Sequence, residues 1–474
     1  MPRLRPLLAG ILLVLLTCLG TGAAAVASPG AAVKEPAVAA AAFADSVGVN
    51  LRPGDAAAGW ALAERLEAAG IRHVRGPAAT DPGDPALAGL RALAGADLQL
   101  DLVAGPGADA EAVAEVAASL GTAVGALEAP AGEAATPLRR AVRAHPRLPG
   151  VAVLGSGAGA DYQTVRLELG GRCPGCADDE LGSGDGAVQV TEVDLGAGVP
   201  AAVAARYLPR LLLANAGRAV RTYIAGQGAD DSGPGLLDAA GSPTPAYAAV
   251  ANLLALLDDR RRQVDPDPLG FRLTGSTSGV SHRLLQKADG HFWLALWVEQ
   301  PGWNPATGQE LAVPAQQVTV ALTEPVAGAR SFVPELGTVA QDSFTDPPGP
   351  ARLHAIDLEV SDQVVLLELL PLGAGGSAPN ATAPPTVPAQ ATATTQGPVV
   401  KGSSQPASST TRPAGDAARA AAAARPTAAL DPASRSPLAF TGSTALSMLG
   451  ASMLLLVVGA AALFASRRRY HHRH

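Results

Sequence analysis

Between residues 45 and 259, short apolar runs alternate with amphipathic stretches, and this alternation limits the fold more than any other feature of the chain. A short apolar run followed by an amphipathic stretch is the pattern of a strand and its crossover in a parallel sheet. Eight such runs predict an α/β fold in which the strands close into a TIM-like (β/α)8 barrel. The runs lie at 46–51, 73–75, 98–103, 124–128, 151–154, 164–169, 188–193 and 220–224.

The stretches between these runs differ in length. Helical periodicity is clear in four of them, at 57–69, 109–120, 200–216 and 245–257. Residues 44–262 are compact for eight strand–helix units, so we expect some crossovers to be short or to lack a helix. The clearest gap lies between the runs at 151–154 and 164–169.

After residue 267 the pattern changes to short strands separated by turns, which predicts a small antiparallel β-sandwich over 267–371. The run from His291 to Trp297 is apolar on both faces, so we expect it to be a central strand. The predicted strands lie at 271–273, 280–286, 292–298, 317–322, 329–332, 353–358 and 364–369.

The N-terminal residues 1–27 have the three parts of a secretory signal peptide. Arg3 and Arg5 precede an apolar segment, and small residues from Ala25 to Ala27 provide a cleavage site. Residues 28–43 are rich in Ala, Val and Pro, and we expect a loose leader there. The chain is therefore expected to be exported.

The C-terminus, residues 438–474, contains a pentapeptide, an apolar span and a basic tail, in that order. The pentapeptide is Leu438-Ala439-Phe440-Thr441-Gly442. The span from 444 to 465 carries no charge and is long enough to cross a bilayer as a helix, with the basic tail on the cytoplasmic side. A plain single-pass membrane anchor is one interpretation of this pattern.

The order of these three parts also resembles the cell-wall sorting signal of sortase substrates. Ala439 at the second position is similar to the variant used in high-GC Gram-positive bacteria. The resemblance implies that a sortase cleaves between Thr441 and Gly442 and joins Thr441 to peptidoglycan, after the membrane helix has held the precursor in place. The expected location is the cell wall, outside the cell.

Residues 373–436 consist mainly of Ala, Pro, Thr, Ser and Gly, with almost no large apolar side chains. Such a segment cannot bury enough apolar surface to fold, so it predicts a disordered linker. At ~3.1 Å per residue in extended form, its reach is on the order of 200 Å, which suits a stalk that spans the wall.

Charge and cysteine content exclude some classes of function. The net charge is −7 and no basic stripe precedes the C-terminal tail, so we expect no nucleic-acid partner. Cys173 and Cys176 form a Cys-Pro-Gly-Cys motif, which in the cytosol could be a redox motif or half of a zinc site. No second pair exists and His is scarce nearby, so in an exported chain we expect a disulfide, with no metal and no cofactor.

Two glutamates fall at the strand ends where a barrel holds its active site. Glu128 ends the fourth predicted strand, and Glu192 lies near the end of the seventh. Retaining glycosidases need two carboxyl groups ~5 Å apart, one as acid/base and one as nucleophile. Glu133 and Asp194 are weaker candidates for these roles, and Arg75 either orients a carboxylate in the barrel mouth or forms an internal ion pair.

The barrel and the sandwich together resemble the clan A glycoside hydrolases, especially the xylosidase and iduronidase type. The resemblance covers roughly two-thirds of the chain and rests on short motifs of moderate specificity. It implies that Glu128 donates the proton and that Glu192 is the nucleophile. The motifs are Val47-Gly48-Val49-Asn50, Gly70-Ile71-Arg72-His73-Val74-Arg75, Val190-Thr191-Glu192, Gly235-Leu236-Leu237-Asp238 and Pro243-Thr244-Pro245-Ala246-Tyr247.

The chain also departs from that family's pattern. Leu127 and Ala129 stand where the family has Asn and Pro around the acid/base, and Arg166 and Glu168 stand where relatives place His and Tyr. Residues 225–227 lack bulky polar or aromatic groups, and the whole barrel has few aromatic platforms for a sugar.

Two hypotheses follow from the sequence. In the first, the barrel is degenerate and serves as a carbohydrate- or surface-binding module on a wall-anchored protein. In the second, it is an active retaining glycoside hydrolase that acts on extracellular or cell-wall glycans. The first agrees better with the missing side chains.

Overall fold

The computed structural model describes residues 34–51, 59–176, 188–227, 233–259, 264–345 and 352–372. They belong to one compact unit. The predicted signal peptide, linker and sorting signal lie outside the described residues. Within the described part of the chain, no helix is long and apolar enough to span a membrane.

Eight parallel strands close into a barrel, as the apolar runs predict. The strand order is β3-β4-β5-β6-β7-β8-β9-β10, and β10 pairs with β3 to complete the circle. The strands are β3 (Val47–Asn50), β4 (His73–Pro77), β5 (Gln99–Val103), β6 (Val124–Glu128), β7 (Ala152–Gly155), β8 (Tyr162–Glu168), β9 (Val188–Asp194) and β10 (Thr222–Ala225).

Helices cover the outside of the barrel because their apolar faces pack on the outward-facing side chains of the strands. They are α3 (Gly59–Ala68), α4 (Ala86–Gly95), α5 (Ala110–Ser119), α6 (Thr136–Ala144), α7 (Ala201–Asn215) and α8 (Pro245–Leu256), with the short 3-10 turn η2 (Gly121–Ala123) before β6. Residues 156–161, between β7 and β8, form turns without a helix, which confirms the expected gap.

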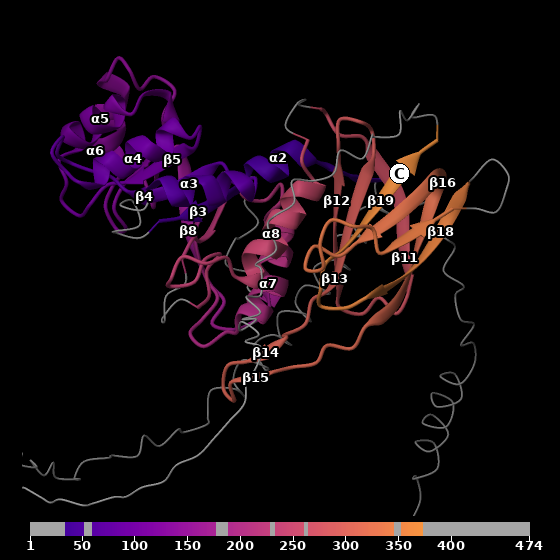
Figure 1. The fold of residues 1–474 in the computed structure, drawn as a ribbon. Coiled ribbons are helices and arrows are strands. Elements are labelled where there is room, and N and C mark those ends of the chain that lie inside the picture. Colours follow the sequence, from indigo (N-terminus) through magenta and orange to yellow (C-terminus); the bar gives the residue numbers. More distant parts are fainter. Residues whose placement is uncertain are drawn as a thin grey trace, which may run out of the picture. The chain divides into compact units, whose positions relative to one another are not determined.

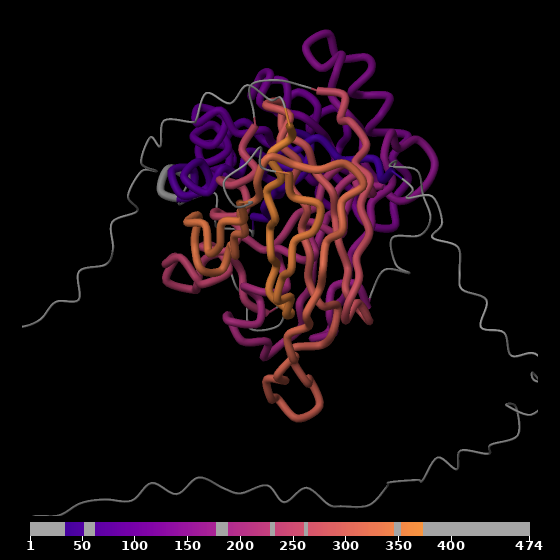
Figure 2. The backbone as a smooth tube through the Cα atoms, turned by 90° about the vertical axis from the view of Figure 1, so that its right-hand side faces the viewer, coloured from indigo at the N-terminus to yellow at the C-terminus, as the bar shows by residue number. Residues whose placement is uncertain are grey.

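The rest of the described chain forms an antiparallel sheet, as the sequence predicts. Its central path runs β1-β11-β16-β19-β13-β12-β2, where β1 is Lys34–Pro36 and β2 is Val38–Ala39. All neighbours on this path are antiparallel except β2, which pairs with β12 in parallel, and β17 and β18 also pair with β16. The strands are β11 (Pro268–Gly275), β12 (Val280–Gln286), β13 (Phe292–Val298), β16 (Gln316–Phe332), β17 (Asp342–Phe344), β18 (Leu353–Val360) and β19 (Val365–Pro371). A separate hairpin pairs β14 (Trp303–Asn304) with β15 (Gln309–Glu310) and extends from the sheet in Figure 2.

Strand β16 joins two halves of this sheet. Its first part pairs with β11 and β18, and after a register shift between Ala321 and Val326 its second part pairs with β17 and β19. The two halves share one apolar core, so the single sheet folds over itself like a sandwich. Strand β13 is central, and all seven of its residues are buried.

The N-terminal segment differs from the loose leader that the sequence predicts. Residues 34–36 form β1 (Lys34–Pro36) and pair with β11, and β2 (Val38–Ala39) pairs with β12. The helix α2 (Ala40–Asp45) follows and buries Phe43 in the barrel core. From residue 34 on, the predicted leader is therefore part of the sheet and of the barrel core. Hydrophobic periodicity does not reveal these elements because each of them is very short.

Helices α7 and α8 lie between the barrel strands and the sheet (Figure 1). The face of β13 that carries Trp293 and Trp297 belongs to the same apolar core as the barrel. Arg210 of α7 has no exposed surface and ion-pairs with Glu299, just after β13, and also bonds the backbone oxygen of Gln300. Barrel and sheet therefore share one core.

Candidate active site at the barrel mouth

Glu128 and Arg75 form a buried ion pair at the carboxyl ends of their strands. Arg75 Nε donates to Glu128 Oε2 at 2.7 Å, and Arg75 Nη2 donates to Glu128 Oε1 at 2.9 Å. The Glu128 side chain is 7% exposed and that of Arg75 is 18% exposed. Of the two roles that the sequence leaves open for Arg75, the structure shows a bidentate ion pair that also orients the carboxylate.

Asn50 extends this pair toward the seventh barrel strand. Its Oδ1 accepts a bond from Arg75 Nη1 at 3.0 Å, and its Nδ2 donates to the backbone oxygen of Thr191 at 2.8 Å. The network therefore connects β3, β4, β6 and β9 across the mouth. Each of the three guanidinium nitrogens of Arg75 donates a bond, two of them to Glu128 and one to Asn50.

Glu192 reaches the same mouth because of an irregularity in β9. The pairing of β8 with β9 shifts register between Val165 and Arg166, so that Thr191 is an extra residue on the β9 side. The side chain of Gln189 bonds Asp101, so Gln189 faces the barrel interior. If side chains alternated strictly along β9, Glu192, three residues later, would face the opposite side. The bulge brings Glu192 back to the interior, in the manner in which bulges re-aim side chains.

Arg166 of β8 sits among three carboxylates at this end of the barrel. It lies 3.4 Å from Glu192, 3.3 Å from Asp194 and 3.5 Å from Glu168. The side chain of Glu192 is 40% exposed and that of Arg166 is 48% exposed. A position where the family resemblance implies His or Tyr therefore carries a cation that neutralises part of an acidic cluster.

Arg75 interacts electrostatically with both Glu128 and Glu192. Burial alone would lower the pKa of Arg75, but the hydrogen bond and charge of Glu128, with smaller contributions from Glu192 and Tyr223, raise it above its ordinary value. Arg75 is therefore a fixed cation between the predicted acid/base and the predicted nucleophile. The structure brings both predicted glutamates to one end of the barrel, with this cation near each.

The chemistry open to the two glutamates differs. Both oxygens of Glu128 accept bonds from the Arg75 guanidinium, which fixes the orientation of the carboxylate. Glu192 is partly exposed and has only long contacts to Arg166. Glu192 is therefore the more accessible of the two carboxylates, and Glu128 is held in a buried ion pair.

Deeper in the barrel, the structure shows a buried polar cluster that the sequence did not single out. Asp101 of β5 is completely buried, and both Tyr223 OH and Gln189 Nε2 donate to its Oδ2, the latter at 2.9 Å. Burial and the Asp101 charge raise the pKa of Tyr223 well above its ordinary value. The sequence does contain a signal for this cluster, namely an acidic residue inside an apolar strand, in Leu100-Asp101-Leu102.

Two tyrosines and the weaker candidate Glu133 make contacts elsewhere in the fold. Tyr207 accepts a bond from the Gly302 backbone N–H at 2.8 Å, and Tyr247 donates to the Arg65 backbone oxygen at 2.8 Å, so each links two segments of the fold. Glu133 lies on an exposed loop, where its Oε1 accepts a bond from the Gly107 N–H at 3.1 Å.

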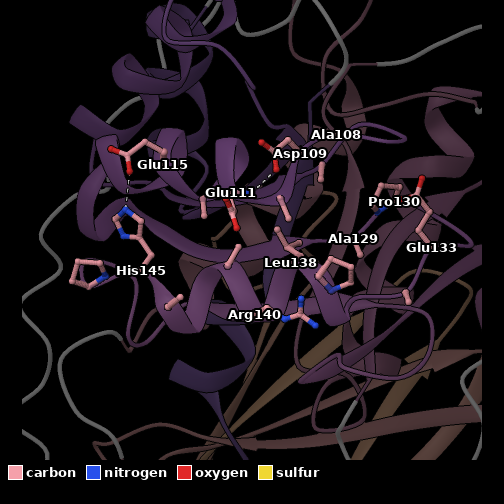
Figure 3. Close-up of a pocket in the computed structure, with 18 residues that line it drawn as sticks. Ala108, Asp109, Glu111, Glu115, Ala129, Pro130, Glu133, Leu138, Arg140 and His145 are labelled. Carbon is pink, nitrogen blue, oxygen red and sulfur yellow. Dashed lines mark hydrogen bonds and ion pairs between the residues drawn. The ribbon is translucent and has the colours of Figure 1, made fainter.

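A pocket of about 620 Å³ lies between α5 and α6, outside the barrel (Figure 3). Alanines form much of its wall, and Asp109, Glu111, Glu133 and Arg140 lie around it. Neither Glu128 nor Glu192 lines this pocket. Ala104 and Ala129, which directly follow β5 and β6, also line it, so the groove begins at the carboxyl ends of these two strands.

Cys173 and Cys176 form a disulfide with a Cα–Cα distance of 5.2 Å, in the loop that follows β8. The loop packs on the sheet, because a Cβ added at Gly175 would lie 2.7 Å from Glu299 side-chain atoms. Among the described residues, no group of three or more His, Cys, Asp or Glu side chains is placed to hold a metal ion.

No family model matches the chain, and no curated protein matches it. Solved structures with a similar fold include a family 39 glycoside hydrolase from Bacteroides cellulosilyticus WH2, at 15% identity over 71% of this chain and 83% of that chain, with a TM-score of 0.41. A GH30 endoxylanase from Clostridium papyrosolvens C71 gives 8% identity over 72% and 98%, with a TM-score of 0.42.

A third structure is a 4-O-α-L-rhamnosyl-β-D-glucuronidase from Fusarium oxysporum 12S. It is 10% identical over 72% of this chain and 98% of that chain, with a TM-score of 0.47. Identities and TM-scores of this size transfer no activity to the present chain. Its function has to be argued from its own side chains.

Proposed function

We propose that this chain is a wall-anchored surface protein whose barrel binds a glycan or another surface ligand without hydrolysing it. The observation that carries the non-catalytic part is the bidentate Arg75–Glu128 pair, which occupies both oxygens of the predicted proton donor. The absence of the family's Asn beside Glu128, where Leu127 stands, also supports it, because that Asn helps to hold the substrate in the enzymes that the sequence resembles.

The proposal is tested on residues 34–372, which include the β1 and β2 strands. Binding to a broad glycan panel is measured for the parent and for a variant that carries both Glu128→Gln and Glu192→Gln. We expect binding of both proteins to the same ligand and no product release. Turnover by the parent that the double change removes would contradict the proposal.

An active retaining hydrolase is the second candidate, and the position of Glu192 favours it. The bulge at Thr191 turns Glu192 into the mouth, where its side chain is 40% exposed and within the electrostatic reach of Arg75. A retaining enzyme would form a covalent glycosyl–carboxylate intermediate. Incubation with activated fluoro-sugars followed by peptide mass spectrometry would locate a label on Glu192 in that case, and Glu192→Gln would prevent it.

The proposed anchoring rests on the sequence from Leu438 to the basic tail. In a Gram-positive host with the matching sortase, we expect the mature chain in the peptidoglycan fraction and ending at Thr441. Thr441→Ala would leave the precursor in the membrane fraction, while Ser443→Ala, which lies outside the pentapeptide, would not. Recovery of the parent and of Thr441→Ala alike in the membrane fraction would leave the plain membrane anchor, and equal attachment of both to the wall would mean a linkage other than Thr441.

A further inference from the structure

The groove between α5 and α6 has the dimensions of a ligand site. Its volume of about 620 Å³ lies within the range of ~300–1,000 Å³ that is usual for ligand pockets. It follows the two helices from Asp109 and Glu133, near the barrel strands, to Glu115 and His145 at the other end (Figure 3). From Asp109 to Glu115 the helix rises by about 9 Å, which is the length of about three residues of extended chain.

The floor of this groove consists of small side chains. Ala110 and Ala114 line it from α5. Ala141 and Ala144 line it from α6, beside the buried Leu138. None of the lining residues is Phe, Tyr or Trp, so the groove offers no flat ring on which a sugar would stack. A floor of methyl groups instead suits a ligand with methyl-sized side chains.

The two helices bring opposite charges to the groove. Glu111 of α5 and Arg140 of α6 both line it, and among the described residues neither side chain has a hydrogen bond or an ion pair. Figure 3 shows both side chains beside the groove, with no bond between them. At the far end, by contrast, Glu115 and His145 are bonded to each other across the two helices at 3.0 Å. A free carboxylate and a free guanidinium therefore remain for a ligand in the middle of the groove.

Negative charge predominates at the end of the groove nearest the barrel. Asp109 accepts a bond from the backbone N–H of Glu111 through Oδ1. Glu133 accepts one from the backbone N–H of Gly107 through Oε1. The second oxygen of each carboxylate has no partner within the described part of the chain. With Glu111 these groups give three carboxylates against one free guanidinium, which is complementary to a ligand that carries more positive than negative charge.

We propose that this groove binds a short peptide of alanine-sized residues that carries free amines and a terminal carboxylate. The carboxylate pairs with Arg140, whose planar guanidinium matches it with two parallel bonds. The amines pair with Glu111 and the carboxylates beside it, and the peptide's methyl groups contact the alanines of the floor. This inference does not depend on the glycan binding proposed for the mouth, because neither Glu128 nor Glu192 lines the groove.

Isothermal titration of residues 34–372 with the tripeptide Lys-Ala-Ala tests the proposal. This peptide has two amines, one free carboxylate and two methyl side chains. We expect saturable binding to the parent, weakened about tenfold by Arg140→Gln and by Glu111→Gln, because each change removes a charge-assisted bond. Arg91→Gln and Glu64→Gln are the matched controls. They remove the same charges from exposed positions of α4 and α3 outside the groove, and they should bind as the parent does.

Ala141→Leu tests the shape of the groove, because the larger side chain fills the floor on which the peptide lies. It should abolish binding of Lys-Ala-Ala. Ala88→Leu, on the exposed face of α4, adds the same side chain outside the groove and should bind as the parent does. Circular dichroism of each variant verifies that it is folded.

Three results would overturn the proposal. The first is the absence of saturable binding of Lys-Ala-Ala to the parent at concentrations up to about 10 mM. The second is equal affinity for acetyl-Ala-Ala-amide, which has the methyl groups but no charge. The third is equal affinity of the parent and Ala141→Leu, which would place the peptide elsewhere on the molecule.

Discussion

The two predicted glutamates of the barrel mouth meet different cations in different surroundings. Arg75 holds Glu128 with two short bonds, whereas Glu192 faces Arg166 at 3.4 Å and keeps much of its surface exposed. Burial makes the first pair energetically important and solvent makes the second weak. Two glutamates that look equivalent in the sequence are therefore expected to respond very differently to substitution.

Arg75→Ala should destabilise the fold by about 3–5 kcal/mol, because it leaves the buried Glu128 carboxylate without its partner. Urea denaturation of residues 34–372 measures this loss. Glu192→Gln is the matched control and should change the free energy of unfolding by less than about 1 kcal/mol, since its contacts are long and exposed. A small effect of Arg75→Ala would show that water or another cation compensates Glu128.

Glu335 provides a pH-dependent contribution to stability. Burial raises its pKa from 4.5 to about 8, opposed by the backbone amides of Glu335 and Val364 and by the charge of Arg206. Between these two pH values the folded state keeps a proton that the unfolded state has lost. Stability from this group is therefore complete below pH 4.5 and decreases as the pH rises toward 8.

Glu335→Gln removes this titration, so its free energy of unfolding should exceed that of the parent by about 3 kcal/mol at pH 7, with no such gain near pH 4. Urea denaturation at both pH values gives the difference. Comparing the two proteins at each pH cancels the contributions of other carboxylates. An advantage that did not grow with pH would mean that Glu335 is ionised in the folded state.

Among the barrel elements, β3 and β10 meet where a glycine lies opposite a tyrosine, Gly48 beside Tyr223. Gly48 of β3 lies against the ring of Tyr223, and a Cβ added there would be 2.4 Å from one ring carbon and 2.5 Å from another. The missing side chain at Gly48 is what lets Tyr223 lie inside the barrel and reach Asp101. Closure of the barrel and the buried cluster therefore depend on the same small residue.

Gly48→Ala should destabilise the barrel by about 3 kcal/mol, because the Tyr223 ring has to move away and lose its bond to Asp101. Gly95→Ala, at the end of α4, is the control, since nothing lies within 4 Å of the added methyl. That control should be neutral or stabilising by up to about 1 kcal/mol. Equal urea midpoints for the two variants would contradict the close packing.

In the whole molecule, the barrel and the antiparallel sheet share a core and a buried ion pair. Trp293, Trp297 and Phe332 of the sheet pack in the same apolar cluster as the barrel. Arg210 of α7 reaches Glu299 beyond β13. The predicted boundary near residue 262 is therefore a boundary in secondary structure type and not between independently folded parts.

Residues 34–372 should unfold in a single transition, followed by circular dichroism and by tryptophan fluorescence. Residues 44–262 alone would expose the face of the barrel that the sheet covers, so we expect aggregation or loss of the cooperative transition. The intermediate fragment 44–372 lacks β1 and β2, and it should be soluble but less stable than 34–372. A soluble, cooperatively folding fragment 44–262 would refute the shared core.

The sequence alone was sufficient for the eight barrel strands, the antiparallel strands that follow, and the placement of Glu128 and Glu192 at one end. Apolar runs and their spacing are local properties, and parallel strands bring their carboxyl ends together whatever their exact register. Only the tertiary structure decided which partners these glutamates meet. The Arg75–Glu128 pair joins residues 53 positions apart, and the bulge at Thr191 sets the direction of Glu192. The pairing of 34–39 with the distant sheet and the buried polar cluster around Asp101 also depend on barrel closure and strand register, which no local pattern encodes.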